Sequence, residues 1–442
     1  MKSALPDNRT DADPASTPWP VLAAVTVLTG VAAGLGGMLL ALLLHAIQHL
    51  AYGYSLGDVH ADESFLQGVT GSSPLRRFLV LSVCGAMAGI GWWAIRRFGS
   101  PLVSIGDAVN NAERMPTLTT VLDDVLQIVT VGLGSPLGRE VAPREIGALS
   151  ASVLSRRARI TAEETRIMIA CGAGAGLAAV YNVPLGGAVF TLEMLLGTLG
   201  LSTVIPAIAT SAIAACIAWI GLGDETPYVL PPLSINRSLI TWSIVAGPVF
   251  GLAAHWFADA VRSARARAPR DWRVPIWCAV VFPVIGLLAI PFPQILGNGK
   301  GLALLGFDGS LTIGLAATLL IVKTFATISA LRAGAEGGLL TPSVAIGATL
   351  AALMSAMWNR IWPGSPPGPF AVIGATAFLA SSQRMPLTAI VLMMEFTRVD
   401  HDFLIPMAFA VAGSISTSHL VNRGAAADRR GTESSNCDHP KE

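Results

Sequence analysis

A carboxylate and a guanidinium stand side by side in the stretch Gly138–Pro143, which reads GREVAP. The stretch leads into a helix-like segment, residues 144–156, inside a chain with many apolar runs. Charges at membrane depth are costly and usually functional, and a helix N-terminus attracts anions through its free N–H groups and its dipole. Glu140 would then be a tethered anion in a place where a free anion binds. The alternative is that Arg139 and Glu140 form an ion pair at the membrane interface.

The composition indicates an all-α polytopic membrane protein with many tilted and broken helices. Of the 442 residues, 52% are hydrophobic and 13% are charged, about half the charged fraction of a typical chain, and the mean hydropathy is +0.61. The 45 glycines and 28 prolines are scattered through the apolar segments, where they permit breaks and close packing. The formal net charge of +1 argues against a nucleic-acid partner, so the expected surroundings are the lipid bilayer.

Apolar runs fill residues 19–422, which we expect to form one transmembrane domain. A polar segment, 1–18, precedes it, and a disordered cytoplasmic tail, 423–442, follows it. Two arginine-rich connections, 156–166 and 262–273, place those loops in the cytoplasm by the positive-inside rule, and we expect both termini on the same side. The apolar runs are 21–50, 76–97, 121–137, 168–196, 202–222, 239–261, 274–290, 311–331, 339–358, 370–397 and 403–421.

The chain shows no pattern typical of an enzyme or a metal site. Its five cysteines are far apart and four lie in apolar runs, so neither a disulfide framework nor a metal cluster is expected. His45 and His49 have a metal-binding spacing, but their segment supplies no carboxylate or cysteine, and we interpret them as interfacial side chains. The nucleophile and base motifs of an intramembrane protease or lipid transferase are missing from the sequence. We therefore expect no catalysis and no cofactor.

The sequence repeats itself at an offset of about 200 residues, in two units at roughly 75–222 and 237–421. Gly138 corresponds to Gly338, for example, and a glycine, a proline and a glutamate recur farther on with the same spacing. These are Gly172, Pro184 and Glu193 in the first unit, and Gly374, Pro386 and Glu395 in the second. Interrupted repeats of this kind are typical of transporters whose site lies near the bilayer midplane, where half-helices meet.

Three breaks converge on such a site, at 99–101, 138–140 and 337–342. The first offers the hydroxyl of Ser100, and the other two offer backbone N–H groups at helix starts. A carrier of cations or organic solutes would instead need acids that pair with its substrate. Glu193 and Glu395 are available, but at segment ends a structural hydrogen bond to neighbouring backbone is the commoner role. The breaks therefore favour a small inorganic anion as the partner.

These residues resemble the CLC family of chloride channels and chloride/proton antiporters, of the prokaryotic type without CBS domains. The three filter motifs of that family are matched, with changes, by GSPLV at 99–103, GREVA at 138–142 and GLLTP at 338–342. The most specific match is GAGAGLAAVYNVPLGGAVFTLE at 172–193, and the resemblance runs from about residue 21 to 421. It implies the CLC-type inverted repeat, a homodimer with one pore per subunit, and a place in the bacterial inner membrane.

The resemblance also assigns roles to individual residues. The Ser100 hydroxyl and the backbone N–H groups of Leu339 and Leu340 would bind the anion. Glu140 would compete with the anion as the gate, and Arg139 would attract anions to the pore mouth. The expected function is selective transport of chloride or a similar small anion, gated by Glu140.

Two departures from the family bear on how transport proceeds. Proton-coupled members carry a second glutamate as a proton relay directly after the one matched by Glu193, but this chain has Met194 there. Members also use a tyrosine near the last spans to coordinate the anion, and here only His401 or Phe403 stands near that place. A fluoride-exporting branch departs at the same positions, so fluoride is a candidate. We expect channel-like or weakly proton-coupled transport; the alternative is a proton-coupled chloride or fluoride antiporter that uses Glu193 or water as its relay.

Overall fold

The computed structural model describes residues 17–53, 65–111 and 113–437. Within these ranges the chain is largely helical, and seven helices are long and apolar enough to cross a membrane, which confirms the predicted all-α membrane fold. The seven are α1 (Trp19–Tyr52), α3 (Pro74–Phe98), α9 (Leu201–Leu222), α10 (Arg237–Ala266), α13 (Ile313–Arg332), α14 (Leu340–Ile361) and α17 (Leu404–Cys437). The shorter helices are α2 (Phe65–Gly71), α4 (Ile105–Asn110), α5 (Thr117–Gly132), α6 (Val141–Ala158), α7 (Ala162–Tyr181), α8 (Pro184–Phe190), η1 (Thr191–Leu196), α11 (Arg273–Leu288), η2 (Pro293–Ile295), α12 (Lys300–Phe307), α15 (Pro367–Gln383), α16 (Pro386–Thr397) and η3 (His401–Phe403).

The two ends of the chain relate differently to the expectation. Of the polar segment expected at 1–18, residues 1–16 lie outside the described residues. At the other end, α17 continues through Cys437, whereas we expected residues 423–442 to be disordered. The alanine run at 425–427 favours a helix there, because alanine has the highest helix propensity of all residues.

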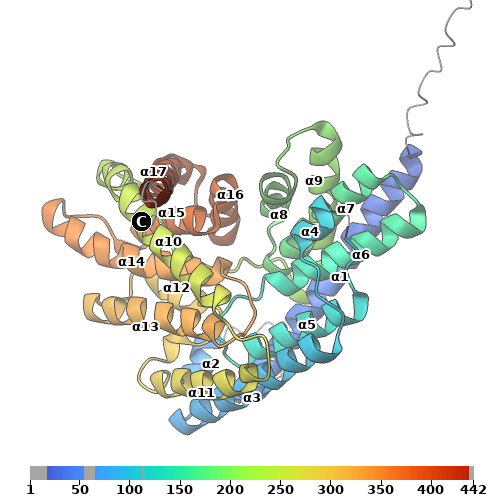
Figure 1. The fold of residues 1–442 in the computed structure, drawn as a ribbon. Coiled ribbons are helices and arrows are strands. Elements are labelled where there is room, and N and C mark those ends of the chain that lie inside the picture. The colour runs from blue at the N-terminus through green and yellow to red at the C-terminus, as the bar shows by residue number, and fades with distance from the viewer. Residues whose placement is uncertain (1–16, 54–64, 112, 438–442) are drawn as a thin grey trace, which may run out of the picture.

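The two sequence repeats form two halves that meet along the centre of the molecule (Figure 1). Helices α1 and α4 to α9 gather in one half, and α10 and α12 to α17 gather in the other. The halves exchange contacts through equivalent elements, because α8 packs against α16, and α3 packs against α11. A site between the halves is therefore built from both repeats.

Each half contains a helix pair that is broken by the same backbone chemistry. The helix α7 stops before Asn182, which adopts a left-handed conformation with a φ of 53°, and α8 then begins at Pro184. In the second half α15 stops before Arg384, with a φ of 58°, and α16 begins at Pro386. A left-handed residue ends a helix, and proline is tolerated in the first turn of the next one. Each break falls at the proline that recurs in the two sequence repeats.

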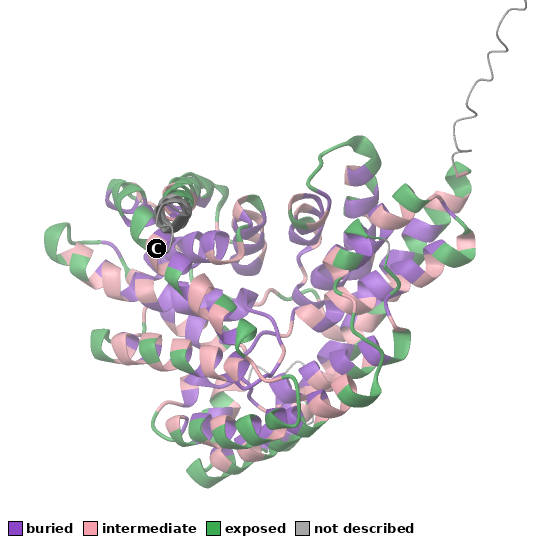
Figure 2. Cartoon of the chain, viewed as in Figure 1, coloured by how far each residue is buried: buried purple, intermediate pink, exposed green. Residues whose placement is uncertain are grey.

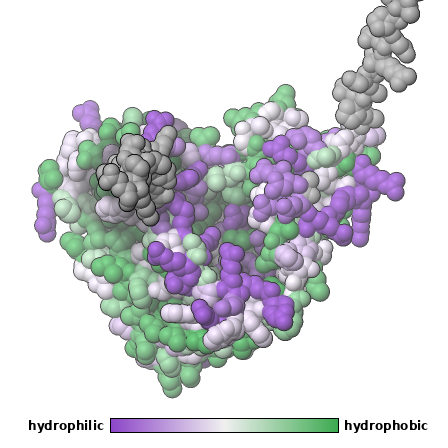
Figure 3. Space-filling model, viewed as in Figure 1, coloured by the Kyte–Doolittle hydropathy of each residue, from purple (hydrophilic) through white to green (hydrophobic). Residues whose placement is uncertain are grey.

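The centre of the fold is buried, and its outer helices present apolar side chains. In α14, 72% of the most apolar stretch is buried, against 33% in α3, α13 and the span that contains the start of α17. Figure 2 shows the same contrast between inner and outer helices. Large apolar side chains are exposed on many outer helices, and Figure 3 shows apolar surface over much of the lower part of the molecule. Such extensive apolar surface is expected where lipid covers a protein.

Arg77 ties α3 to the loops around it. Its side chain is buried, and both terminal nitrogens of the guanidinium donate hydrogen bonds to backbone carbonyls at 2.9–3.2 Å. The accepting carbonyls belong to Thr70, Ser72, Ala289 and Ile290. One side chain therefore satisfies loop carbonyls from two distant parts of the chain.

We expect Arg77→Met to lower the free energy of unfolding by on the order of 3 kcal/mol, because hydrogen bonds from a charged donor contribute about 1.5–3 kcal/mol and buried carbonyls would lose their donor. The measurement is the thermal unfolding temperature in detergent. Arg166→Met is the control, since Arg166 forms an exposed pair with Glu163 and such pairs contribute about 0–1 kcal/mol. Equal unfolding temperatures for the two variants would contradict the structural role of Arg77.

Candidate functional site

Two equivalent loops from the two repeats pair at the centre of the fold. The Gly138 N–H donates to the Gly338 carbonyl at 2.7 Å, and the Gly338 N–H donates to the Gly138 carbonyl at 2.9 Å. The pairing is antiparallel, as expected of repeats that are inverted relative to each other. It brings the N-terminus of α6 next to the N-terminus of α14. The correspondence of Gly138 and Gly338, found from the repeat, is thus also a physical contact.

Glu140 lies at this meeting point and is only 1% exposed. Its Oε1 accepts a hydrogen bond from the Leu340 N–H at 2.5 Å, where α14 begins. The carboxylate therefore occupies the positive end of a helix from the other repeat, where both the free N–H groups and the dipole favour negative charge. The amide predicted to hold an anion is filled by the side chain predicted to compete for it.

The two paired glycines leave just enough space for the Glu140 carboxyl group. A Cβ atom on Gly138 would lie 2.1 Å from Oε2, and one on Gly338 would lie 2.0 Å from Oε1. Both distances are far below van der Waals contact. Only glycine at these two positions allows the carboxylate to be held against the backbone.

Tyr181, at the end of α7, also reaches the carboxylate. Its hydroxyl donates to Oε2 of Glu140 at 3.4 Å and lies 3.0 Å from the Thr341 hydroxyl. Tyr181 was not among the predicted site residues, because the anion-coordinating tyrosine of the family was expected near the last spans. The position of Tyr181 in the sequence could have indicated its role. Tyr181 directly precedes the break at Asn182, and the ends of interrupted helices converge on the site.

Two arginines supply positive charge next to Glu140. The guanidinium carbon of Arg139 lies 5.1 Å from the centre of the Tyr181 ring, within range of a cation–π interaction. Arg144, which the sequence analysis did not single out, donates from Nε to the Glu140 backbone carbonyl at 2.9 Å. Its guanidinium lies 5.2 Å from the Phe190 ring centre. The charge around the carboxylate is thus more positive than the motif alone indicated.

Leu339 is buried beside the pair of glycines and borders a small cavity of about 150 Å³. Arg262 and Arg265 of α10 line the same cavity, and Arg265 donates to the Gly337 carbonyl at 3.1 Å. This cavity leads to Leu339 from a side that carries two guanidinium groups. It is a suitable approach for an anion.

Ser100 and the two residues considered as substitutes for the tyrosine occupy different places. Ser100 is exposed, and its N–H donates to the Thr119 hydroxyl at 3.1 Å. Among the described contacts none joins Ser100 to Glu140, so its role as an anion ligand stays a prediction. His401 is exposed at the start of the last span, and Phe403 is fully buried in the apolar core.

Glu193 is bound to the start of α16. Its Oε1 accepts from the Leu387 N–H at 2.9 Å, while Oε2 accepts from the Thr388 N–H at 2.7 Å and the Thr388 hydroxyl at 2.6 Å. Glu395 does the same in reverse at the start of α8, accepting from the N–H groups of Leu185 at 3.0 Å and Gly186 at 2.6 Å. The two glutamates therefore cap each other's helices, as expected for a structural hydrogen bond at a segment end.

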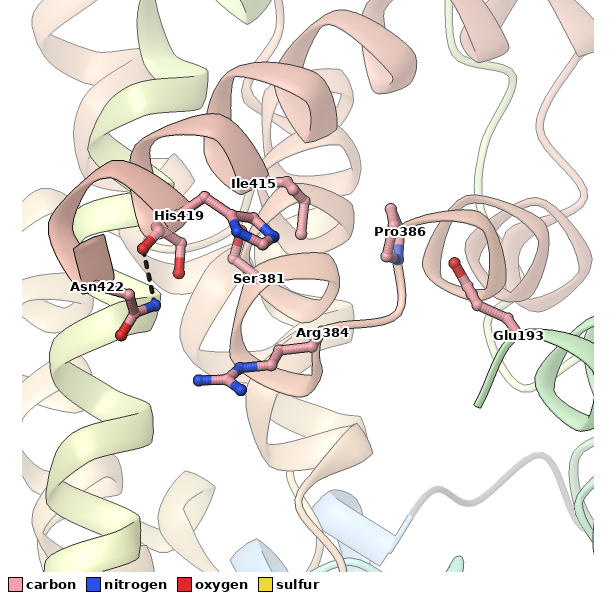
Figure 4. A pocket seen from close by; sticks show the side chains of 8 residues that line it. Glu193, Ser381, Arg384, Pro386, Ile415, His419 and Asn422 are labelled. Atoms are coloured by element: carbon pink, nitrogen blue, oxygen red, sulfur yellow. Dashed lines mark hydrogen bonds between the residues drawn. The ribbon is translucent and has the colours of Figure 1, made fainter. Parts of the chain in front are cut away.

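Glu193 also borders the larger of the two cavities, of about 530 Å³. Arg384, His419 and Asn422 line it from α17 and from the end of α15 (Figure 4). In Figure 4 Glu193 lies across Pro386 from these side chains. Most of the side chains that line the cavity are polar, and it is large enough to hold water beside Glu193.

The fold and the site define a class of protein: a helical membrane protein of two inverted repeats whose helix N-termini meet around a buried carboxylate and can receive an anion. The chain belongs to the CLC family, because the family model for voltage-gated chloride channels matches residues 81–419. It is therefore a membrane protein of a family that transports anions and whose members are channels or transporters.

Individual relatives cover most of the chain. The voltage-gated ClC-type chloride channel ClcB of Citrobacter koseri is 26% identical over 350 residues, which are 76% of this chain and 82% of that protein. The H(+)/Cl(-) exchange transporter ClcA of Vibrio campbellii is 27% identical over 356 residues, 77% and 76% of the two chains. A solved structure of a slow cyanobacterial Cl-/H+ antiporter has a TM-score of 0.78 at 19% identity and covers 91% of this chain and 95% of its own.

Removal of the Tyr181 hydroxyl should loosen Glu140 without disturbing the fold. A hydroxyl hydrogen bond contributes about 0.5–1.5 kcal/mol net, so Tyr181→Phe should raise anion flux at alkaline pH, where Glu140 is ionised, by about twofold to tenfold. The measurement is anion efflux from proteoliposomes. Tyr228→Phe is the matched control, because Tyr228 packs in the same aromatic cluster without a described bond to Glu140. An equal rise in both variants would contradict a specific role of Tyr181.

Proposed function

We propose that this chain moves a small inorganic anion, chloride or one like it, across the membrane, with Glu140 as the gate. The observation that carries the proposal is the hydrogen bond from the Leu340 N–H to the Glu140 carboxylate. A carboxylate that fills an anion-binding helix N-terminus blocks it, and any event that removes the carboxylate opens it to a free anion.

The residues around Glu140 have separate tasks in this proposal. Arg139 attracts anions to the mouth of the pore, and the N–H groups of Leu339 and Leu340 take the place of part of the water shell of the anion. Ser100 adds a hydroxyl donor farther along the route. Protonation removes the negative charge of Glu140, which weakens its hold on the helix N-terminus and lets an anion enter.

We infer that transport is channel-like or weakly coupled to protons. The position of the proton relay in the family holds Met194, which cannot carry a proton, and Glu193 accepts three hydrogen bonds in the cap of α16. One of the two bacterial relatives is named as a chloride channel and the other as an exchange transporter. The alternative is an antiporter of chloride or fluoride in which Glu193 or water passes the proton. Fluoride is a candidate anion because the first and third filter motifs are altered.

The remaining parts of the proposal concern assembly and orientation. We propose a homodimer with one pore per subunit, in which apolar side chains exposed on α8, α9 and α16, such as Leu185, Ile205 and Leu387, are covered by the second copy. The arginine-rich loops favour cytoplasmic termini. Both relatives are bacterial proteins, which supports the inner membrane as the location.

Glu140→Gln should abolish the pH dependence of anion flux and leave the fold intact, because the amide has no charge to titrate and holds a helix N-terminus less strongly than a carboxylate. We would measure flux against pH in proteoliposomes, together with reversal potentials in chloride, nitrate and fluoride gradients. Glu163→Gln, at an exposed carboxylate, is the control. A full pH dependence in Glu140→Gln would show that the carboxylate is structural, and an inactive parent protein would refute anion transport.

Glu193→Gln and Glu395→Gln form a matched pair, since the two carboxylates make equivalent caps. If both are structural, each variant should lose about 1–3 kcal/mol of unfolding free energy, and neither should change the ratio of proton to anion movement selectively. Thermal unfolding and paired proton and chloride fluxes give the two readouts. A fixed proton ratio in the parent protein that disappears only in Glu193→Gln would identify Glu193 as the relay and support the antiporter.

A further inference from the structure

Three acidic side chains, two from α5 and one from α6, come together outside the anion site. Asp123 and Asp124 of α5 are 3% and 0% exposed, and Glu145 of α6 is half-buried. One carboxylate oxygen from each lies within 4.8 Å of the others. These residues belong to no motif of the sequence, because they come from two different helices.

The hydrogen bonds of this acidic cluster are incomplete. Asp123 is satisfied, because Trp92 donates to Oδ1 at 2.9 Å and Gln127 donates to Oδ2 at 2.7 Å. Both carboxylate oxygens of Asp124 and the amide oxygen of Gln127 are buried and have no donor among the described residues. A carboxylate oxygen of Asp124 lies within 4.8 Å of one of Glu145. Two buried carboxyl groups this close need a positive species between them, since ionised carboxylates only accept hydrogen bonds.

Within the described residues, the arginines nearby form no ion pair with the cluster. Arg96 pairs with Glu336 at 2.6 Å, and Arg144 is held at the Glu140 carbonyl. No ion pair joins Asp123, Asp124 or Glu145 to a basic side chain in the described part of the chain. Buried carboxylates that are neither paired nor coordinated become neutral by binding protons.

Protons fit this cluster better than a metal ion. Both oxygens of Asp123 already accept hydrogen bonds from N–H groups, which leaves five oxygens: two from Asp124, two from Glu145 and the amide oxygen of Gln127. A hard cation such as Ca²⁺ takes six to eight oxygen ligands. Two carboxyl groups at such short range share a proton, because both cannot be ionised together.

The acidic cluster also connects two places that matter for transport. At one end, Glu336 is in electrostatic range of Asp123 and of Glu145, and its side chain is 45% exposed, so it meets solvent. At the other end, Arg144 is in electrostatic range of both Glu145 and Glu140. The charged groups that face the cluster are therefore Arg96, Arg144 and Glu336.

We propose that Asp123, Asp124 and Glu145 form a proton-binding site that fills from solvent near Glu336 and controls the gate Glu140 through Arg144. The inference rests on the proposed function of Glu140. A hydronium ion from the solvent near Glu336 gives its proton to the cluster and is left as water. The cluster gains one proton and loses one negative charge in this step, and no other bond changes.

The effect on the gate follows from the shared arginine. When the cluster is protonated, Arg144 acts on Glu140 alone and favours the ionised, blocking carboxylate. When Glu145 is ionised, it competes for the same guanidinium, and Glu140 accepts a proton more easily. The site thus replaces the relay position lost at Met194 with a weaker, electrostatic form of proton control.

The proposal predicts shifts of opposite sign for two isosteric variants. In Glu145→Gln, Arg144 loses its second partner, so the pH of half-maximal anion flux should fall by about half a unit or more. In Asp124→Asn, the new amide donates to Glu145 and keeps it ionised, so the same midpoint should rise by a similar amount. Both are measured as chloride efflux from proteoliposomes over a pH series, with Glu163→Gln as the matched surface control.

Opposite shifts with an unchanged control support the proposal, and identical pH profiles in both folded variants overturn it. A thermal stabilisation of the parent by Ca²⁺ or Mg²⁺ that Asp124→Asn abolishes would make the cluster a metal site instead and also overturn it. If a variant does not fold, infrared spectra of the parent decide: a band from protonated carboxyl groups at neutral pH that persists in Glu140→Gln supports the site, and its absence refutes it. A parent without anion flux at any pH would refute the transport proposal and leave this infrared test standing.

Discussion

The hydrogen bond between the Leu340 N–H and the Glu140 carboxylate sets the requirements for the centre of this molecule. It needs a helix that begins inside the protein, and α14 begins there because the loop before it pairs with its counterpart through Gly138 and Gly338. It needs glycine at both of these positions, because any side chain would collide with the carboxylate. It also needs a buried site, since a helix N-terminus in water would bind the carboxylate only weakly.

The same interaction occurs three times, and the number of donors separates Glu140, the proposed gate, from the caps formed by Glu193 and Glu395. Glu193 and Glu395 each place a carboxylate on the helix start of the other repeat and receive two backbone N–H groups, with a hydroxyl added for Glu193. Glu140 receives one N–H group and one long hydroxyl bond. Charge-assisted hydrogen bonds are among the strong ones, so the carboxylate with the fewest of them is the one that leaves its place at the lowest cost.

The sequence was sufficient for features that depend on local chemistry or on the repeat. The recurring prolines, Pro184 and Pro386, mark the breaks before α8 and α16, and the offset of about 200 residues predicted that Gly138 and Gly338 are equivalent. It was insufficient for contacts between helices that are distant in the chain. The approach of Tyr181 to Glu140 depends on how α7 packs against α6, and the convergence of Asp123 and Asp124 with Glu145 depends on the rotation of α5. Neither the packing of α7 on α6 nor the rotation of α5 produces a periodic pattern in a single sequence.

A buried residue of the second repeat provides a comparison for the acidic cluster. Lys323 stands 200 positions after Asp123, in the equivalent helix α13, and is also fully buried. Its ammonium group donates to the carbonyls of Ile295 at 2.9 Å and Gly297 at 2.6 Å, so protein groups satisfy it. A buried polar group with partners stabilises a fold, whereas one without partners destabilises it. Both carboxylate oxygens of Asp124 lack such partners among the described residues, and the proposed proton would remove this cost.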